Sequence, residues 1–256
     1  MIQRLHKEHC RNVIRRAAAP SYRGRIDVVS GVLVEAIGIP AAMGELCRIE
    51  RGSLGPIHAE VIGFRGDRTL LMPHGDLQGL APGQTVFALG RSFSIDVSDA
   101  LLGRVLDGFG APLDGRPTAA GGSRRAVRSD APLPLSRSAI KEPLCTGVRA
   151  IDGLNTLGRG QRVGIFAGAG VGKSTLLGQV TRSTDADVVV ACLVGERGRE
   201  VRDFLEEAIG SDALGRSVLV AATSDRSPLE RQTAPWVAVT IAEPVSYTHL
   251  TLPTKA

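Results

Sequence analysis

Residues 165–177 of the chain, IFAGAGVGKSTLL, contain a glycine-rich turn followed by residues that favour a helix. Gly168, Gly170 and Gly172 allow the backbone to curl so that successive N–H groups point at phosphate oxygens. The N-terminus of the following helix adds a partial positive charge. The run AGAGVGKS at 167–174 fits the phosphate-binding loop, except that Ala167 stands where the usual pattern has glycine. The stretch therefore predicts a nucleotide-binding domain.

Two side chains of this loop have predicted roles of their own. Lys173 supplies a full positive charge for the β and γ phosphates of a nucleoside triphosphate. The hydroxyl of Ser174 is placed to ligate Mg²⁺. A chance glycine-rich turn is disfavoured because the loop follows a candidate strand and opens a helix, as phosphate binding requires.

The sequence around the loop alternates between apolar β-type runs and helical runs. The predicted strands are 162–166, 187–194 and 217–223, and the predicted helices are 173–182 and 199–210. This alternation is typical of a parallel sheet covered by helices on both sides. Such sheets bind ligands at the carboxyl ends of their strands.

A second constellation, GERGRE at 195–200, follows the predicted strand 187–194 directly. Glu196 could reach the γ-phosphate side and orient an attacking water molecule. Arg197 could hold that carboxylate or touch phosphate. From spacing alone, a turn at the end of a strand, followed by the charged first turn of a helix, is an equal alternative. Glu200 is predicted to be a surface or capping charge of that helix.

The N-terminal part of the chain differs in pattern. Residues 1–22 predict a basic helix, which either packs on its own protein or docks on a partner or an anionic membrane. Residues 23–95 consist of short β-rich runs separated by turn clusters, which is typical of a small closed barrel. Residues 96–145 are rich in Pro, Gly, Ala, Ser and Arg and are predicted to connect the barrel to the next domain.

Composition limits the other possibilities. The 256 residues carry a formal charge of +5, a mild bias toward anionic partners. The four cysteines form no C-x-x-C pair, which favours a reducing cytosol over a zinc or disulfide scaffold, and no run of 18 apolar residues could cross a bilayer. Aromatic residues amount to only 4% and the barrel has no basic stripe interleaved with them, which argues against nucleic-acid binding and an RNA translocase.

Four motifs in order resemble one family. They are LGRVLDGFGAPLDG at 102–115, TGVRAIDGL at 146–154, GRGQRVGIFAGAGVGKSTLL at 158–177 and LVGERGREVRDFLEEAIG at 193–210. From about Arg23 to Glu243 the chain resembles the ATPases of type III protein export, in their flagellar and injectisome branches. These ATPases are relatives of the catalytic subunits of rotary ATP synthases. A rotary ATP synthase subunit remains the nearest alternative enzyme for this chain.

The resemblance implies a fold and an active site. The fold is an N-terminal β-barrel, then an α/β, RecA-like P-loop core with a parallel sheet at 146–243, and a helical C-terminal domain. The implied cofactors are ATP and Mg²⁺, with Ser174 on the metal, Lys173 on the phosphates and Glu196 as catalytic carboxylate beside Arg197. The implied phosphate-binding residues are Gly168, Ala169, Gly170, Val171, Gly172, Lys173, Ser174 and Thr175.

The resemblance also implies partners and a location. Family members assemble as hexamers with nucleotide between subunits. They work with a stator or regulator protein, the export gate, export substrates and their chaperones, in the cytoplasm and peripherally at the inner face of the cytoplasmic membrane. The implied function is ATP hydrolysis that energises the unfolding and export of proteins. A nucleotide- and partner-binding fragment without turnover is the alternative.

The chain departs from the family pattern near its end. Pro235 stands where relatives usually carry alanine, and we expect the helix there to kink or end near Ala234. After Glu243 the residues PVSYTHLTLPTKA lack the expected strand with a carboxylate at its tip. We therefore expect 244–256 to be a non-native tail. The chain would then be C-terminally truncated, with incomplete catalytic machinery.

Overall fold

The computed structural model describes residues 22–119, 121–129, 133, 135, 137, 139–168 and 170–249. The predicted basic helix within 1–22 lies outside these residues, apart from Tyr22. The chain divides between Phe93 and Ser94 into two compact units, which are described one at a time.

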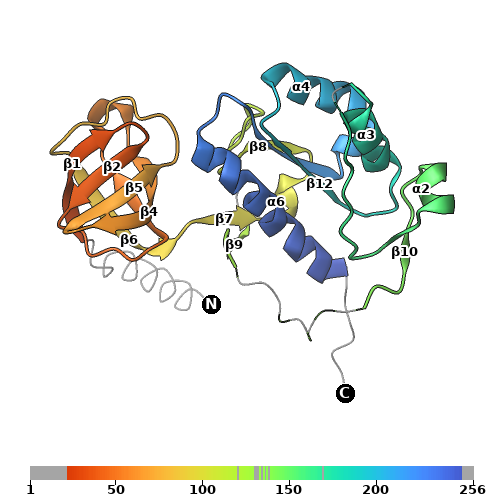
Figure 1. The fold of residues 1–256 in the computed structure, drawn as a ribbon, viewed down its shortest axis with the longest axis horizontal. Coiled ribbons are helices and arrows are strands. Elements are labelled where there is room, and N and C mark those ends of the chain that lie inside the picture. Colours follow the sequence, from red (N-terminus) through yellow and green to blue (C-terminus); the bar gives the residue numbers. More distant parts are fainter. Residues whose placement is uncertain are drawn as a thin grey trace, which may run out of the picture. The chain divides into compact units, whose positions relative to one another are not determined.

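The first unit is a closed six-stranded barrel, as the sequence predicts (Figure 1). Around the barrel the strands follow the order β1-β2-β5-β4-β3-β6, and β1 pairs with β6 to close it. The bounds are β1 Arg23–Ser30, β2 Leu33–Ile37, β3 Glu45–Ile49, β4 Ile57–Arg65, β5 Arg68–Pro73 and β6 Thr85–Ser92, with a short 3₁₀ turn η1 at Gly52–Leu54.

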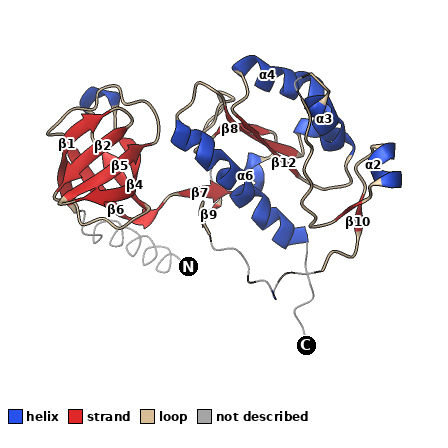
Figure 2. Ribbon diagram, viewed as in Figure 1, coloured by secondary structure: helices blue, strands red, loops and turns tan. Residues whose placement is uncertain are grey.

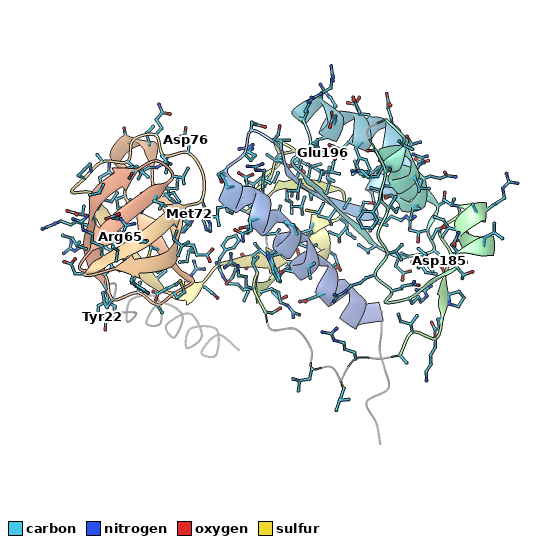
Figure 3. All side chains as sticks on the ribbon, viewed as in Figure 1. Tyr22, Arg65, Met72, Asp76, Asp185 and Glu196 are labelled. Carbon is cyan, nitrogen blue, oxygen red and sulfur yellow. The ribbon has the colours of Figure 1, made fainter. Side chains whose placement is uncertain are left out.

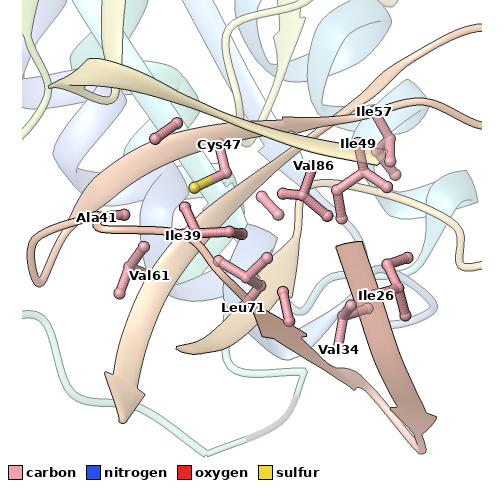
Figure 4. Packing of buried hydrophobic residues seen from close by; sticks show 13 residues of the cluster. Ile26, Val34, Ile39, Ala41, Cys47, Ile49, Ile57, Val61, Leu71 and Val86 are labelled. Atoms are coloured by element: carbon pink, nitrogen blue, oxygen red, sulfur yellow. The ribbon is translucent and has the colours of Figure 1, made fainter. Parts of the chain in front are cut away.

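The barrel interior is filled by one apolar cluster (Figure 4). In β5 every second residue is buried, because successive side chains of a strand point to opposite faces. Ile26, Ile49 and Leu71 are among the largest side chains that are fully buried. Burial raises the pKa of the Cys47 thiol to about 12, so this cysteine is an inert part of the core.

The second unit is a layered α/β structure built on a parallel sheet with the order β12-β13-β8 (Figure 2). Its strands are β7 Ser94–Val97, β8 Arg104–Asp107, β9 Ser123–Ala126, β10 Pro143–Leu144, β11 Leu157–Gly158, β12 Val189–Val194 and β13 Ser217–Ala222. Its helices are the 3₁₀ turn η2 Asp99–Leu101, α2 Arg149–Leu154, α3 Lys173–Ser183, α4 Gly198–Asp203, the π-helix η4 Phe204–Ile209, α5 Gly210–Leu214 and α6 Pro228–His249.

The central strand β13 is buried along its whole length. Leu219 and Ala221 pack against Val201, Phe204 and Ile209 of α4 and η4. The other residues of β13, such as Val218 and Val220, point to the opposite face of the sheet, because side chains alternate along a strand. The long helix α6 contacts both β12 and β13. The sheet therefore lies between helices, which confirms the predicted α/β class with a parallel sheet.

The predicted strand at 162–166 is not formed. Residues 161–168 have no regular secondary structure, and the Phe166 side chain is 97% exposed. An apolar run can favour an extended backbone, but a strand also needs a neighbour that takes up its hydrogen bonds. Among the described residues, β12 pairs only with β13, and residues 161–168 join neither strand. The strand prediction is therefore wrong for this structure.

Helix α6 continues through Pro235, so of the expected kink or end near Ala234, the end is wrong. Pro235 is exposed. The carbonyl of Arg231, four residues earlier, loses its helical donor, but on this side of the helix water can replace it. The opposite side packs inward through Leu229, Thr233, Ala234, Val237, Ala238 and Ile241. This burial offsets the cost of the missing hydrogen bond.

Two further regions bear on the predicted domain boundaries. Within residues 96–145, predicted as a connection, β8 forms a full strand of the parallel sheet beside β13. The backbone of α6 extends into the predicted tail as far as His249, and residues 250–256 lie outside the described part. None of the helices in the described part of the chain has the length and apolar character needed to cross a bilayer.

Candidate nucleotide-binding site

The glycine-rich loop has the backbone conformation that its sequence predicts. Gly170 and Gly172 have φ angles of 76° and 101°, in the left-handed region that residues with a Cβ rarely adopt. Gly172 is the N-cap of α3, and its carbonyl accepts the first helical bond from the Leu176 N–H at 2.9 Å. Ala169, one of the predicted phosphate-binding residues, lies outside the described residues.

The first turn of α3 is available to an anion. The N–H groups of Lys173, Ser174 and Thr175 precede the first helical bond, so they have no acceptor within the helix. All three residues are exposed. Gly168, Gly170, Val171 and Gly172 are exposed as well. Unused N–H donors, the helix dipole and the Lys173 charge together form an arrangement suited to phosphate.

Helix α3 is held close to the π-helix η4 by a glycine. Gly178 is buried, and a Cβ added there would lie 2.5 Å from Ala208 Cβ and 2.8 Å from its carbonyl oxygen. Arg182, one turn further along α3, donates hydrogen bonds to the carbonyls of Glu207 and Ala208. The absence of a Cβ at Gly178 thus allows α3 to approach η4 this closely.

A larger residue at position 178 is expected to separate these helices. Gly178→Val should destabilise the fold by about 1–3 kcal/mol, the usual cost of overpacking a core, and should weaken nucleotide binding by moving α3. Urea denaturation and titration with a fluorescent ATP analogue measure the two effects. The matched control is Gly153→Ala in α2, where an added Cβ meets nothing within 4 Å. A Gly178→Val variant as stable as the control would contradict this packing role.

Glu196 lies just beyond the carboxyl end of β12, where the sequence predicts it (Figure 3). The turn that carries it is bonded to the end of β13. The Gly195 N–H donates to the Ala222 carbonyl at 2.8 Å, and the Ser224 N–H donates to the Glu196 carbonyl at 3.0 Å. The backbone of this turn is therefore fixed on two sides.

The Glu196 side chain forms a hydrogen bond with that of Glu200. This bond raises the pKa of Glu196, and burial raises it further, while the Lys173 charge lowers it. The same bond lowers the pKa of Glu200, which also accepts a bond from the Arg197 N–H at 3.4 Å. The Lys173 charge on the loop side therefore acts on the Glu196 carboxyl electrostatically.

A cavity of about 360 Å³ lies between α3 on one side and the Glu196 turn, α4 and η4 on the other. Ser174 and Thr175 of α3 line one part of it, and Glu196 and Glu200 line another. Asp203 and Glu207 extend the acidic lining along α4 and η4. The cavity thus combines residues from the start of α3 with a carboxylate-rich wall, an arrangement in which a bound cation would neutralise the negative charge of that wall.

The predicted site residues are partly brought together. Lys173, Ser174, Thr175 and Glu196 share this region, whereas the Arg197 side chain is 75% exposed and pairs with Glu200 at 3.8 Å. Sequence reasoning assigned Glu200 only a surface or capping role; the structure confirms the cap and also places Glu200 in the lining of the cavity with Glu196. The hydrogen bond from the Ser224 N–H to the Glu196 carbonyl could not be predicted from the sequence, because every residue except proline has such a backbone N–H.

Metal binding by the protein alone is not indicated in the part of the chain that the structure describes, where no cluster of three or more His, Cys, Asp or Glu residues could hold an ion. Mg²⁺ in nucleotide sites commonly uses few protein ligands and completes its shell with water and phosphate. The Ser174 hydroxyl at the cavity, with carboxylates opposite, is compatible with that type of site.

Comparison with family models matches both units. Residues 26–90 match the β-barrel domain of the ATP synthase alpha/beta family. Residues 147–251 match the nucleotide-binding domain of the same family. The second match includes the glycine-rich loop and the Glu196 turn, so the site described above lies within a nucleotide-binding domain.

Individual relatives agree with the family models. A type 3 secretion system ATPase from Xanthomonas euvesicatoria is 49% identical over 221 residues, and a flagellum-specific ATP synthase from Bacillus subtilis (strain 168) is 46% identical over 222 residues. Each alignment covers 86% of this chain and 50% or 51% of the relative. The chain therefore spans about half the length of these relatives.

A solved structure is also similar to this chain. The assembled ATPase EscN in complex with its central stalk EscO, from the type III secretion system of enteropathogenic E. coli, is 42% identical to this chain with a TM-score of 0.80. The alignment covers 88% of this chain and 55% of that one. The chain therefore belongs to the ATP synthase alpha/beta family, whose β-barrel domain and nucleotide-binding domain it carries in that order.

Proposed function

We propose that this chain is the ATP-binding part of a protein-export ATPase of the type III kind, which uses ATP hydrolysis to energise the unfolding and export of proteins. The observation that carries the proposal is the left-handed glycine loop with free helix N–H groups, next to a carboxyl at the end of β12. Relatives named as type 3 secretion and flagellar ATPases support the class of reaction.

Each residue of the site has a proposed role in binding or hydrolysis. The backbone of Gly168–Thr175 binds the phosphates, and Lys173 neutralises the β and γ phosphates. Ser174 would hold Mg²⁺, which when bound supplies charge neutralisation of the phosphate oxygens. Glu196, once deprotonated, orients water for attack on the γ phosphate, and Arg197 lies beside it at the start of α4.

We extend the proposal to assembly and location by analogy with the relatives. The solved EscN structure is titled as an assembled ATPase bound to a central stalk. We propose a homo-hexamer that contacts a stator or regulator protein, the export gate, export substrates and chaperones. It would act in the cytoplasm, peripherally at the inner face of the cytoplasmic membrane.

A second candidate is nucleotide binding without turnover. It is favoured by the exposure of Lys173 and Ser174 and by the unpaired segment before the loop. Phosphoryl transfer depends on several charges placed together in a site that excludes water, and an open loop does not meet that condition by itself.

Phosphate release by the purified chain with ATP and Mg²⁺ distinguishes the two candidates. Release that Glu196→Gln abolishes without loss of ATP binding supports the hydrolytic function. ATP binding with no release by the unmodified chain supports the second candidate instead. Failure of the chain to bind ATP at all overturns both.

A further inference from the structure

Helix α3 joins the cavity to the opposite edge of the sheet. Its first turn, with Ser174 and Thr175, lines the cavity together with Glu196, which follows the carboxyl end of β12. The helix is 11 residues long and ends at Ser183, so it extends about 16 Å. Arg216, whose guanidinium contacts this end of the helix, immediately precedes β13 and so lies at the amino ends of the strands.

The carbonyl groups at the end of α3 need donors from outside the helix, because the last four carbonyls of a helix have no partner within it. The Val180 carbonyl accepts the Thr184 N–H at 2.9 Å, which closes the last turn. The carbonyls of Thr181 and Arg182 lie beyond this bond. Both accept hydrogen bonds from the Arg216 guanidinium, at 3.2 and 3.1 Å.

Arg216 holds the segment after α3 as well. Its Nη2 group donates to the Thr184 carbonyl at 3.1 Å, and its Nη1 group donates to the Ala186 carbonyl. The main chain of Arg216 is itself fixed, because its carbonyl accepts the Val189 N–H at the start of β12 at 3.1 Å. A guanidinium can make such a set of contacts because its N–H donors form a rigid, planar fork. One anchored side chain thus holds the segment 181–186.

A second arginine continues these contacts to η4. Arg182, whose carbonyl accepts a bond from Arg216, donates through its own guanidinium to the carbonyls of Glu207 and Ala208. Positive charge is favourable at both places, since each arginine lies at the carboxyl end of a helix, where the dipole is negative. The far end of α3 is therefore fixed to β13 by one arginine and to η4 by the other.

The loop end of α3 has less restraint of its own. Gly168, Gly170, Val171 and Gly172 are exposed, and the preceding segment 161–168 has no regular secondary structure. The position of the first turn relative to the Glu196 turn is therefore set by contacts further along the helix. Such contacts matter for binding and catalysis, because a displacement of about 1 Å can cost on the order of 100-fold in rate.

We propose that Arg216 is a positioning residue for nucleotide binding. Its guanidinium fixes the far end of α3 and thereby holds Lys173 and the N–H groups of the first turn opposite the Glu196 turn. Arg216 lies outside the residues that line the cavity, so it acts through the helix and not on nucleotide. This inference rests on the proposed function for the role of the loop, but the contacts of Arg216 are made without nucleotide.

The test compares Arg216→Met and Arg216→Lys with the unmodified chain in two measurements. The first is hydrogen exchange of the nucleotide-free chain, expressed as the exchange rate of the Leu176 amide relative to that of Leu219 in the central strand, so that global unfolding cancels. This ratio should rise in Arg216→Met, because the Leu176 N–H makes the first bond of α3, to the Gly172 carbonyl.

The second measurement is titration with a fluorescent ATP analogue in the presence of Mg²⁺. Arg216→Met should bind the analogue about tenfold more weakly. Arg216→Lys keeps the charge but lacks the planar fork, so its Kd should lie between those of Arg216→Met and the unmodified chain. A normal Kd in Arg216→Lys with a weakened one in Arg216→Met would assign the effect to charge alone and overturn the positioning role.

The matched control for lost stability is Val237→Ala, which removes part of a fully buried side chain from α6, on the other face of the sheet. It should lower the Tm and leave both the exchange ratio and the Kd unchanged. Equal shifts in Val237→Ala and Arg216→Met, or no shift in Arg216→Met, would overturn the proposal.

Two further outcomes are also informative. If Arg216→Met fails to fold, the comparison of Arg216→Lys with Val237→Ala decides. If the unmodified chain does not bind the ATP analogue, the proposed function fails, and the exchange ratio still shows whether Arg216 fixes the first turn of α3.

Discussion

Replacement of Lys173 by alanine is expected to weaken ATP binding by about 100-fold, the largest effect on nucleotide affinity of any single change in this chain. The loop backbone can still offer N–H donors from the first turn of α3, but the full charge opposite the β and γ phosphates is lost. Titration with a fluorescent ATP analogue in the presence of Mg²⁺ measures the change in Kd.

The chain offers a matched control for this experiment. Lys141 is the only other lysine among the residues that the structure describes, and it too is exposed. Lys141→Ala removes the same charge at a position outside the glycine-rich loop and should leave the Kd unchanged. If Lys173→Ala bound ATP within threefold of the unmodified chain, or if both variants weakened equally, the assignment of the Lys173 charge to the phosphates would be disproved.

Asp114→Asn is expected to give the largest loss of stability, a fall on the order of 10 °C in the Tm of the second unit. Asp114 accepts two hydrogen bonds from the Arg104 guanidinium, at 2.6 and 3.0 Å, and the two side chains are only 11% and 8% exposed. Asparagine keeps the shape but removes the charge, which leaves the buried guanidinium on β8 without its counterion.

Differential scanning calorimetry of Asp114→Asn measures this effect, with Glu206→Gln as the control. Glu206 also pairs with an arginine at 3.0 Å, but both side chains are more than 60% exposed, so loss of this pair should scarcely change the Tm. Equal Tm shifts in the two variants would show that burial does not strengthen the Arg104–Asp114 pair.

The effect of Asp114 should also depend on pH with a definite sign. The Arg104 hydrogen bond holds the pKa of Asp114 below its ordinary value in the folded chain. A lowered folded-state pKa contributes stability above the unfolded-state value, about 3.9, which is lost as the pH falls toward the folded-state value. The Tm difference between the unmodified chain and Asp114→Asn should therefore narrow between pH 7 and pH 3.

Much of the fold follows from local sequence. The barrel strands were predictable because their alternating apolar residues and turn clusters act within a few positions, and each strand pairs with another from the same short region. The glycines at 170 and 172 were predictable for the same reason, since only a residue without a Cβ readily adopts their φ angles.

Elements that depend on distant partners could not be predicted in this way. Strand β8 lies in a Gly- and Pro-rich region but pairs with β13, more than a hundred residues later. The segment 162–166 has strand-like residues but no partner among the described residues. Pro235 is tolerated because α6 exposes it and buries the opposite side against the sheet.

The same division applies to the candidate site. The sequence by itself determined the left-handed glycines before α3 and the placement of Glu196 after a strand, because both are set by residues adjacent in the chain. Only the tertiary structure decided that Ser224 braces the Glu196 backbone, that Gly178 sets the approach of α3 to η4, and that Glu200 lines the same cavity as Glu196. These contacts depend on how strands and helices pack, and packing is determined by the whole unit rather than by local residue patterns.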